Sequence, residues 1–233
     1  MNNHQEILEN AAELTSSGNF AEALKIYTTF FDETKGEPGL TGVRLSYCLK
    51  AWSELAQKYP PALNALKEKS DEVRRHLSTQ VHVEIDIDDF DLDLFHEIVS
   101  INAEIGRDLE TIELFQQFEA NAELIPFFFI YIKRLLFKYE KYELCLKYSK
   151  TTDAYIEYWQ DNFTRLCEYF QENSPEQLDT ILKHQVEELN FQLAVLSKNN
   201  KLSDSKKIVS DIIRYLNLTE YKTYISKIDT ALQ

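Results

Sequence analysis

The chain has few of the residues that make tight turns and cofactor loops. Only 5 of its 233 residues are glycine and 5 are proline, whereas an all-β fold uses turn residues throughout. The sequence has no GxGxxG pattern and no glycine-rich loop ending in GKS or GKT, the two common nucleotide-binding motifs. It also lacks the GxSxG motif of a hydrolase nucleophile. We therefore expect neither a β-rich fold nor an enzyme, and no cofactor.

Cysteines and long apolar runs are also scarce. The three cysteines, Cys48, Cys145 and Cys167, lie far apart and form no CxxC pair, which disfavours a disulfide framework or a zinc site. A helix that crosses a bilayer needs about 20 consecutive apolar residues, and no stretch of this sequence approaches that length. The first residues, MNNHQE, do not have the basic and apolar regions of a secretory signal. We expect a cytoplasmic protein that binds no membrane.

Acidic residues outnumber basic ones. The chain has 39 Asp and Glu against 25 Lys and Arg, a formal net charge of −14. Nucleic-acid affinity comes largely from Lys and Arg that neutralise phosphates, so a nucleic-acid partner is disfavoured. A basic or neutral protein or peptide partner, bound in a salt-sensitive way, fits this charge.

Apolar residues recur at i, i+3, i+4 and i+7 along most of the chain, which predicts amphipathic helices with short connections. The predicted helices span 5–17, 20–35, 43–58, 61–78, 92–105, 108–120, 123–139, 141–150, 153–172, 175–197, 203–216 and 219–232. About twelve helices joined in this way indicate an all-α fold, an α-solenoid of antiparallel helix pairs.

The segment at 81–91 does not follow the helical pattern. Val81, Val83, Ile85 and Ile87 alternate with polar residues, but one strand without a partner is marginal. We therefore expect an acidic extended linker at 81–91 between helical subdomains 1–80 and 92–233.

Two further local features are predicted. The helix at 123–139 is apolar almost all round, which predicts burial on several sides. The sequence Ser174-Pro175-Glu176-Gln177 predicts a capping box.

Two partial motifs suggest metal sites. Asp89, Asp91 and Asp93 have the spacing of an EF-hand loop, but Leu94 and Ser100 replace its glycine and its bidentate glutamate. His96 and Glu97 begin a zincin-like pattern, but Ser100 stands where the second histidine is needed. We expect no metal site.

The first helix pair resembles a tetratricopeptide repeat (TPR), a family of helical hairpins with a period of 34 residues. The matching residues are Ile7, Ala11, Leu14, Gly18, Phe20, Ala23 and Tyr27. A second copy at 95–118 departs from the family pattern at Asn102, which is usually large and apolar, and at Thr111, which is usually alanine. Weaker copies span 129–148 and 189–209, and 34 residues separate Gly106 from the equivalent turn position, Glu140.

The resemblance implies a TPR-like superhelix that binds a protein segment in its concave groove. The leading hypothesis is therefore a protein-protein interaction module or scaffold. The groove candidates are Arg44, Trp52, His96, Asn102 and Arg134. The alternative is an acidic stoichiometric inhibitor or immunity-type protein that blocks a basic partner. A helical enzyme or small-molecule sensor would instead need a closed pocket with converging polar groups.

Overall fold

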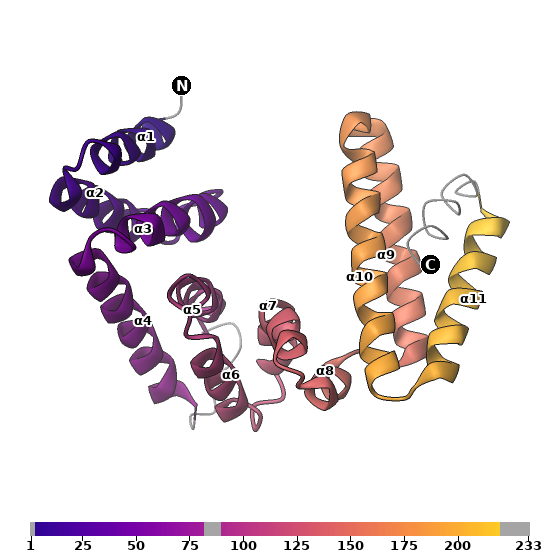
Figure 1. Ribbon diagram of the computed structural model, residues 1–233. Coiled ribbons are helices and arrows are strands. Elements are labelled where there is room, and N and C mark those ends of the chain that lie inside the picture. The colour runs from indigo at the N-terminus through magenta and orange to yellow at the C-terminus, as the bar shows by residue number, and fades with distance from the viewer. Residues whose placement is uncertain (1–2, 82–89, 220–233) are drawn as a thin grey trace. The chain divides into compact units, whose positions relative to one another are not determined.

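The computed structural model describes residues 3–81 and 90–219, and every regular element in these residues is helical (Figure 1). The N-terminal elements are α1 (Asn3–Ser16), α2 (Phe20–Glu33), the π-helix η1 (Val43–Cys48), α3 (Leu49–Ala56), α4 (Pro60–Gln80), α5 (Leu92–Ile105), α6 (Asp108–Gln117) and α7 (Ile125–Lys138). They are followed by α8 (Tyr142–Tyr148), α9 (Thr152–Asn173), the 3₁₀ turn η3 (Pro175–Gln177), α10 (Leu178–Lys198) and α11 (Leu202–Leu218). The predicted all-α class is confirmed for these residues.

The chain divides into two compact units, 1–135 and 136–233, here called unit 1 and unit 2. The division falls within α7, whereas the sequence places a boundary at 81–91. Helices α4 and α5 flank that segment in the sequence and pack directly against each other, and α3 also contacts α5. The helices that flank the acidic segment therefore belong to one packed body. Residues 82–89 of the predicted linker and 220–232 of the predicted last helix lie outside the described residues.

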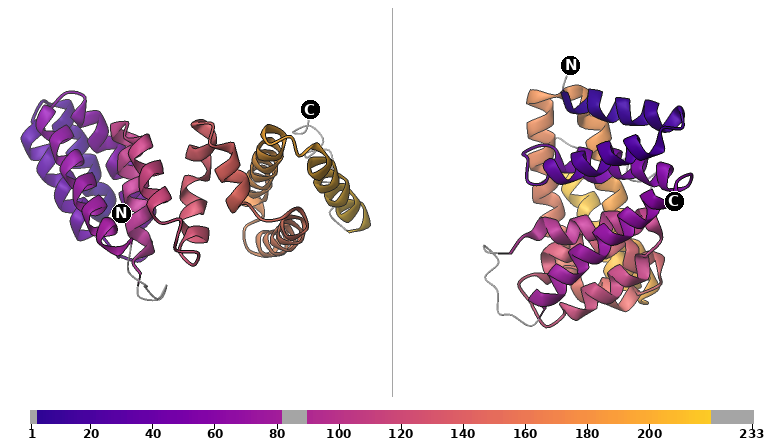
Figure 2. Two further views of the ribbon diagram at one scale, coloured as in Figure 1. Left: turned by 90° about the horizontal axis from the view of Figure 1, so that it is seen from below. Right: turned by 90° about the vertical axis from the view of Figure 1, so that its left-hand side faces the viewer.

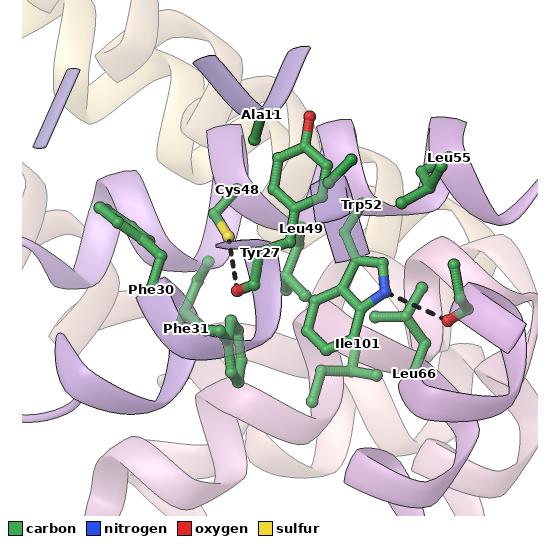
Figure 3. Packing of buried hydrophobic residues seen from close by; sticks show 13 residues of the cluster. Ala11, Tyr27, Phe30, Phe31, Cys48, Leu49, Trp52, Leu55, Leu66 and Ile101 are labelled. Atoms are coloured by element: carbon green, nitrogen blue, oxygen red, sulfur yellow. Dashed lines mark hydrogen bonds between the residues drawn. The ribbon is translucent and has the colours of Figure 1, made fainter. Parts of the chain in front are cut away.

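Helices in unit 1 pack against their neighbours in sequence, from α1 on α2 through α5 on α6. One core cluster is built around Trp52, whose ring meets Phe31 edge to face and whose indole Nε1 donates to the carbonyl oxygen of Ala62 at 3.1 Å (Figure 3). A second group of buried rings connects α5, α6 and α7. In it Phe95 stacks on Phe128 with centroids 4.0 Å apart, and Phe118 meets Phe128 edge to face.

Unit 2 is built on the two long helices α9 and α10, which pack side by side (Figures 1 and 2). The short turn η3 joins them, so they run antiparallel. Helix α11 packs on both of them and α8 packs on α10. The core of unit 2 includes the stacked pair Trp159 and Phe163 together with Leu189 and Ile212, all of them buried. This core is almost wholly apolar.

Four helix turns have the same backbone geometry. Each contains one residue in the left-handed region: Gly18 (φ 85°), Gly106 (φ 73°), Glu140 (φ 58°) and Asn200 (φ 57°). In each turn the residue that follows the left-handed residue donates its N–H to the carbonyl oxygen of the residue five positions before it in the chain. The distances are 2.8 to 2.9 Å. These bonds are Asn19 to Leu14, Arg107 to Asn102, Lys141 to Leu136 and Lys201 to Leu196. Three of these turns, at Gly18, Gly106 and Glu140, occupy the turn positions of the repeat pattern.

Two local predictions differ from the structure. The segment predicted as one helix at 43–58 begins with the six-residue π-helix η1 before α3. The predicted capping box at Ser174 is wrong, because the Ser174 side chain makes no capping hydrogen bond and the chain enters α10 through η3. Side-chain caps form instead at Asp91, which accepts from the N–H of Asp93, and at Thr151, which accepts from Ala154.

Candidate functional site

Helix α7 exposes apolar side chains along one side. Phe127 is 40% exposed and Ile130 is 62% exposed, whereas Phe128 and Ile132 are buried on the other side of the helix. Positions 127, 130, 131 and 134 follow the i, i+3, i+4, i+7 spacing, so their side chains share one face. The prediction that this helix is buried on several sides is therefore wrong for this face.

The exposed face of α7 is joined to α5 by a stacked pair of rings. His96 of α5 lies over Tyr131 of α7 with centroids 4.3 Å apart and an interplanar angle of 14°. We call the side chains of Asp93 and His96 on α5, with Phe127, Ile130, Tyr131 and Arg134 on α7, the α5–α7 surface. It lies wholly within unit 1.

Burial shifts the pKa of both stacked rings. It lowers the pKa of His96 below its ordinary value of 6.5; nearby Asp93 opposes this shift, and Arg44 adds to it. Burial, and then the charge of Asp93, raises the pKa of Tyr131. Both rings are therefore neutral at pH 7. The stack is an uncharged aromatic platform beside the Asp93 carboxylate.

An ion pair with two buried partners holds α5 in place. Arg44 Nη2 lies 2.7 Å from Glu97 Oε2, and the two side chains are 4% and 2% exposed. Arg44 also donates from Nε to the carbonyl oxygen of Phe31 at 2.7 Å, with its guanidinium carbon 3.9 Å from the centre of the Phe31 ring. Lys35 Nζ approaches Glu97 to 3.4 Å. These contacts connect η1, the end of α2, and α5.

A buried chain of hydrogen bonds links α4, α5 and α6. Ser70 Oγ donates to Asn102 Oδ1 at 2.5 Å, and Asn102 Nδ2 donates to Thr111 Oγ1 at 2.9 Å. Asn102 and Thr111 are the two positions at which the second repeat-like copy departs from the family pattern. They face each other across the turn at Gly106, so a polar pair replaces the apolar contact that the pattern would give.

The surface over α4 and α6 has a different character. Arg74 Nη1 lies 2.6 Å from Glu110 Oε2, and Arg107 Nη1 lies 2.6 Å from Asp71 Oδ1. Longer contacts add Glu113 to Arg74 and Glu110 to Arg107. We call these five residues the α4–α6 surface. Its cations are paired with carboxylates from both helices, so it resembles an ordinary solvated exterior.

Charge is distributed unequally between the two units. Residues 1–135 contain 12 Lys and Arg against 24 Asp and Glu, a net charge of −12, whereas residues 136–233 contain 13 against 15, a net charge of −2. Most of the net negative charge of the chain, −12 of −14, therefore belongs to unit 1, the unit that carries the α5–α7 surface.

The structure separates the five residues predicted to line a groove. Trp52 lies in the core, Arg44 in the buried ion pair and Asn102 in the buried hydrogen-bond chain. A partner could reach these three side chains only if unit 1 opened. His96 and Arg134 lie on the α5–α7 surface, Arg134 exposed and His96 partly covered by Tyr131.

Sequence spacing assigns Phe127 to an inner repeat position and Asp93 to the EF-hand-like pattern, but it does not point to Ile130 or Tyr131 as site residues. The signal was present in the apolar run at 124–132, because a helix that is apolar all round must be either enclosed or left with an exposed apolar face. Spacing alone does not distinguish these two outcomes. Here Phe128 of α7 packs against Phe95 and Phe118, while Phe127 and Ile130 remain exposed.

Other kinds of site are weakly represented in the described residues. In 3–81 and 90–219 no group of three or more His, Cys, Asp or Glu side chains is placed to hold a metal ion. Asp91 caps α5, and Asp89 lies outside the described residues. Burial raises the pKa of Cys48 to about 12 and that of Cys145 to about 11, so both remain thiols at neutral pH.

An open hollow of about 430 Å³ lies on α9, lined by Tyr158, Asp161, Thr164 and Arg165. All four residues come from one helix, so the hollow is not a closed pocket of converging groups. Among the described helices none has the length and apolar character to cross a membrane.

Comparison of the chain with protein-family models, with curated proteins and with solved structures finds no match.

Proposed function

We propose that the chain is a protein-protein interaction module, and that unit 1 binds a segment of a partner protein on the α5–α7 surface. One observation carries the proposal: Phe127 and Ile130 are exposed next to an uncharged aromatic stack. Contiguous exposed apolar patches are a feature of protein–protein interaction sites. Aromatic side chains are favoured anchors because they bury a large area at low cost in conformational entropy.

The proposal includes a TPR-like repeat arrangement and a cytoplasmic location. The four turns with one left-handed residue and the same hydrogen bond support the repeat arrangement. In the three turns at Gly18, Gly106 and Glu140 the small residue five positions later, Ala23, Thr111 or Cys145, is fully buried, as close helix packing requires. The three free, buried cysteines support a reducing compartment.

Affinity purification with a matched pair of variants tests the proposal. Ile130→Ser removes an exposed apolar side chain from the α5–α7 surface, and Leu109→Ser removes one of similar exposure, 54%, from α6 in the same unit. We expect the wild-type protein and Leu109→Ser to retain the same stoichiometric partner, and Ile130→Ser to lose it. The purified partner should then bind wild-type protein at 1:1 by calorimetry. A partner retained equally by both variants would contradict the proposal.

The charge asymmetry favours a second candidate, a stoichiometric inhibitor that blocks a basic protein. A net charge of −12 on unit 1 would speed the approach of such a target and make association strongly dependent on salt. Kinetics distinguish the two functions. An inhibitor predicts an association rate constant that falls steeply with salt for a folded basic target, whereas segment binding predicts that a short peptide of the partner retains most of the affinity.

A further inference from the structure

We propose that the segment bound by the α5–α7 surface is an amphipathic helix with a basic polar side. This inference rests on the proposed function, which it makes more specific by naming the chemistry of the partner.

The shape of the surface favours a helix over an extended segment. The side chains at 127, 130, 131 and 134 make a stripe along about two turns of α7, roughly 10 Å long at 1.5 Å per residue. Such a stripe fits the ridge of a second helix, whose apolar residues repeat with the same spacing. An added strand would need an exposed sheet edge, and residues 3–81 and 90–219 contain no strand.

The charges around the stripe select a basic partner. Asp93 is exposed beside the His96–Tyr131 stack, and its charge acts on both rings. Glu123 is exposed in the turn that precedes α7, four residues before Phe127. Within the described part of the chain neither carboxylate forms an ion pair with a cation, whereas Arg74 and Arg107 on the α4–α6 surface each contact two carboxylates.

The apolar and charged parts have separate roles. Burial of Phe127 and Ile130 supplies affinity, and Asp93 and Glu123 supply charge complementarity, which acts mainly on partner choice and association rate. Arg134 at the C-terminal end of the stripe places a positive charge there. The Lys and Arg residues of the partner should therefore lie toward Asp93 and Glu123.

Three synthetic peptides of 14 residues test this inference against the full-length chain. The first is a Lys/Leu peptide with leucines at helical spacing, the second replaces every Lys by Glu, and the third replaces every Leu by Gln. Fluorescence anisotropy is measured at low and at moderate salt with wild-type protein and with Ile130→Ser, Asp93→Asn and Leu109→Ser. Circular dichroism of each variant checks that its helix content is unchanged.

The expected result is binding of the Lys/Leu peptide alone. Ile130→Ser should weaken it roughly tenfold, because an apolar side chain is lost from the contact. Asp93→Asn should weaken it about two- to fivefold and reduce the salt dependence. Leu109→Ser should leave it unchanged.

Several results would overturn the inference. Equal binding of the Glu/Leu peptide would remove the role of charge, and equal binding of the Lys/Gln peptide would remove the role of the apolar stripe. Binding of the Lys/Leu peptide that is insensitive to Ile130→Ser would place it elsewhere on the chain. Sedimentation that shows a dimer dissociated by Ile130→Ser, without peptide binding, would assign the surface to a second copy of the chain.

The two experiments together distinguish a failure of this inference from a failure of the proposed function. If Ile130→Ser loses the cellular partner and no peptide binds, the surface is an interaction site but its partner is not a basic helix. If Ile130→Ser loses neither a partner nor a peptide, both proposals fail.

Discussion

Unit 1 and unit 2 contain almost the same number of basic side chains but differ in acidity and in what they bury. Unit 1 buries charged and polar groups that cross between helices, including the Arg44–Glu97 pair and the Ser70–Asn102–Thr111 chain. In unit 2 the buried polar residues of the described range are Gln185, which accepts a hydrogen bond from Asn162 at 3.2 Å, and Gln192. Unit 1 therefore combines an apolar core with a buried ion pair and a buried polar chain, whereas no charged side chain is buried in the described residues of unit 2.

This difference predicts unequal responses to substitution. The free energy of unfolding falls more when a buried polar group loses its hydrogen-bond or ion-pair partner than when a buried apolar side chain loses one methyl group. Each unit has one tryptophan, Trp52 in unit 1 and Trp159 in unit 2. Trp159→Phe leaves fluorescence that reports on unit 1 alone, and Trp52→Phe leaves fluorescence that reports on unit 2.

The largest effect should follow loss of the buried carboxylate. We expect Glu97→Ala to destabilise unit 1 by about 3–5 kcal/mol, because Arg44 would remain buried without its counter-charge. Urea unfolding followed by Trp52 fluorescence in the Trp159→Phe background measures it. The matched control is Glu110→Ala on the exposed α4–α6 surface, which should cost about 0–1 kcal/mol. Equal losses would contradict the role given to the buried pair.

The next effect concerns the polar chain in unit 1. Asn102→Ala should cost about 2–3 kcal/mol, because Ser70 and Thr111 would lose their partner in a buried place. The double variant Asn102→Leu with Thr111→Ala restores the residue types of the repeat pattern. It should be less destabilised than the sum of the two single variants in the same urea assay. Simple additivity would show that Asn102 and Thr111 do not act as a pair.

These two sites show what sequence spacing can and cannot predict. Periodicity located most helices within a few residues, and Gly18 and Gly106 marked real turns. The polar departure at Asn102 was visible in the sequence, but its partner Ser70 is 32 residues away. Spacing assigns a side chain to a helix face, and only the packing of other helices decides whether that face is covered.

The same limit explains the candidate site. Arg44 was placed on an accessible face because the buried carboxylate that receives it, Glu97, lies far along the chain. Ile130 was placed in a core because a long apolar run is typical of enclosed helices. Local composition suggests a boundary at 81–91, whereas the packing of α4 on α5 is a tertiary contact that composition does not report. In all three cases the outcome depends on which helices pack together, which local spacing and composition do not determine.

A smaller effect tests the four similar turns. Gly106 in unit 1 and Glu140 in unit 2 both adopt left-handed conformations, which cost a residue with a side chain roughly 1–2 kcal/mol. Glu140→Gly should therefore raise the thermal stability of unit 2 by about 1 kcal/mol, whereas Gly106→Ala should lower that of unit 1 by a similar amount. Thermal unfolding of the two single-tryptophan proteins measures both. A destabilising Glu140→Gly would show that the Glu140 side chain matters more than its conformation.

The smallest effect is a pH dependence confined to unit 1. Since burial lowers the pKa of His96 below 6.5, the unfolded state binds the proton more readily, and the stability of unit 1 falls as the pH drops through 6.5. Asp93, Arg44 and Tyr131 are the groups that act on or face this ring. His96→Phe keeps an aromatic stack on Tyr131 and should flatten the slope between pH 7.5 and 5.5. An unchanged slope would assign the dependence to other groups.

The central claim is that unit 1 contacts its partner through the α5–α7 surface and not through the part of α6 around Leu109. Site-specific photo-crosslinking in cells tests it most directly, with p-benzoylphenylalanine placed at Ile130 in one protein and at Leu109 in another, both exposed in unit 1. We predict a single dominant covalent adduct from position 130, absent from position 109 and lost when Phe127 is also replaced by Ser. The same adducts from both positions, or an adduct from position 109 alone, would contradict the claim.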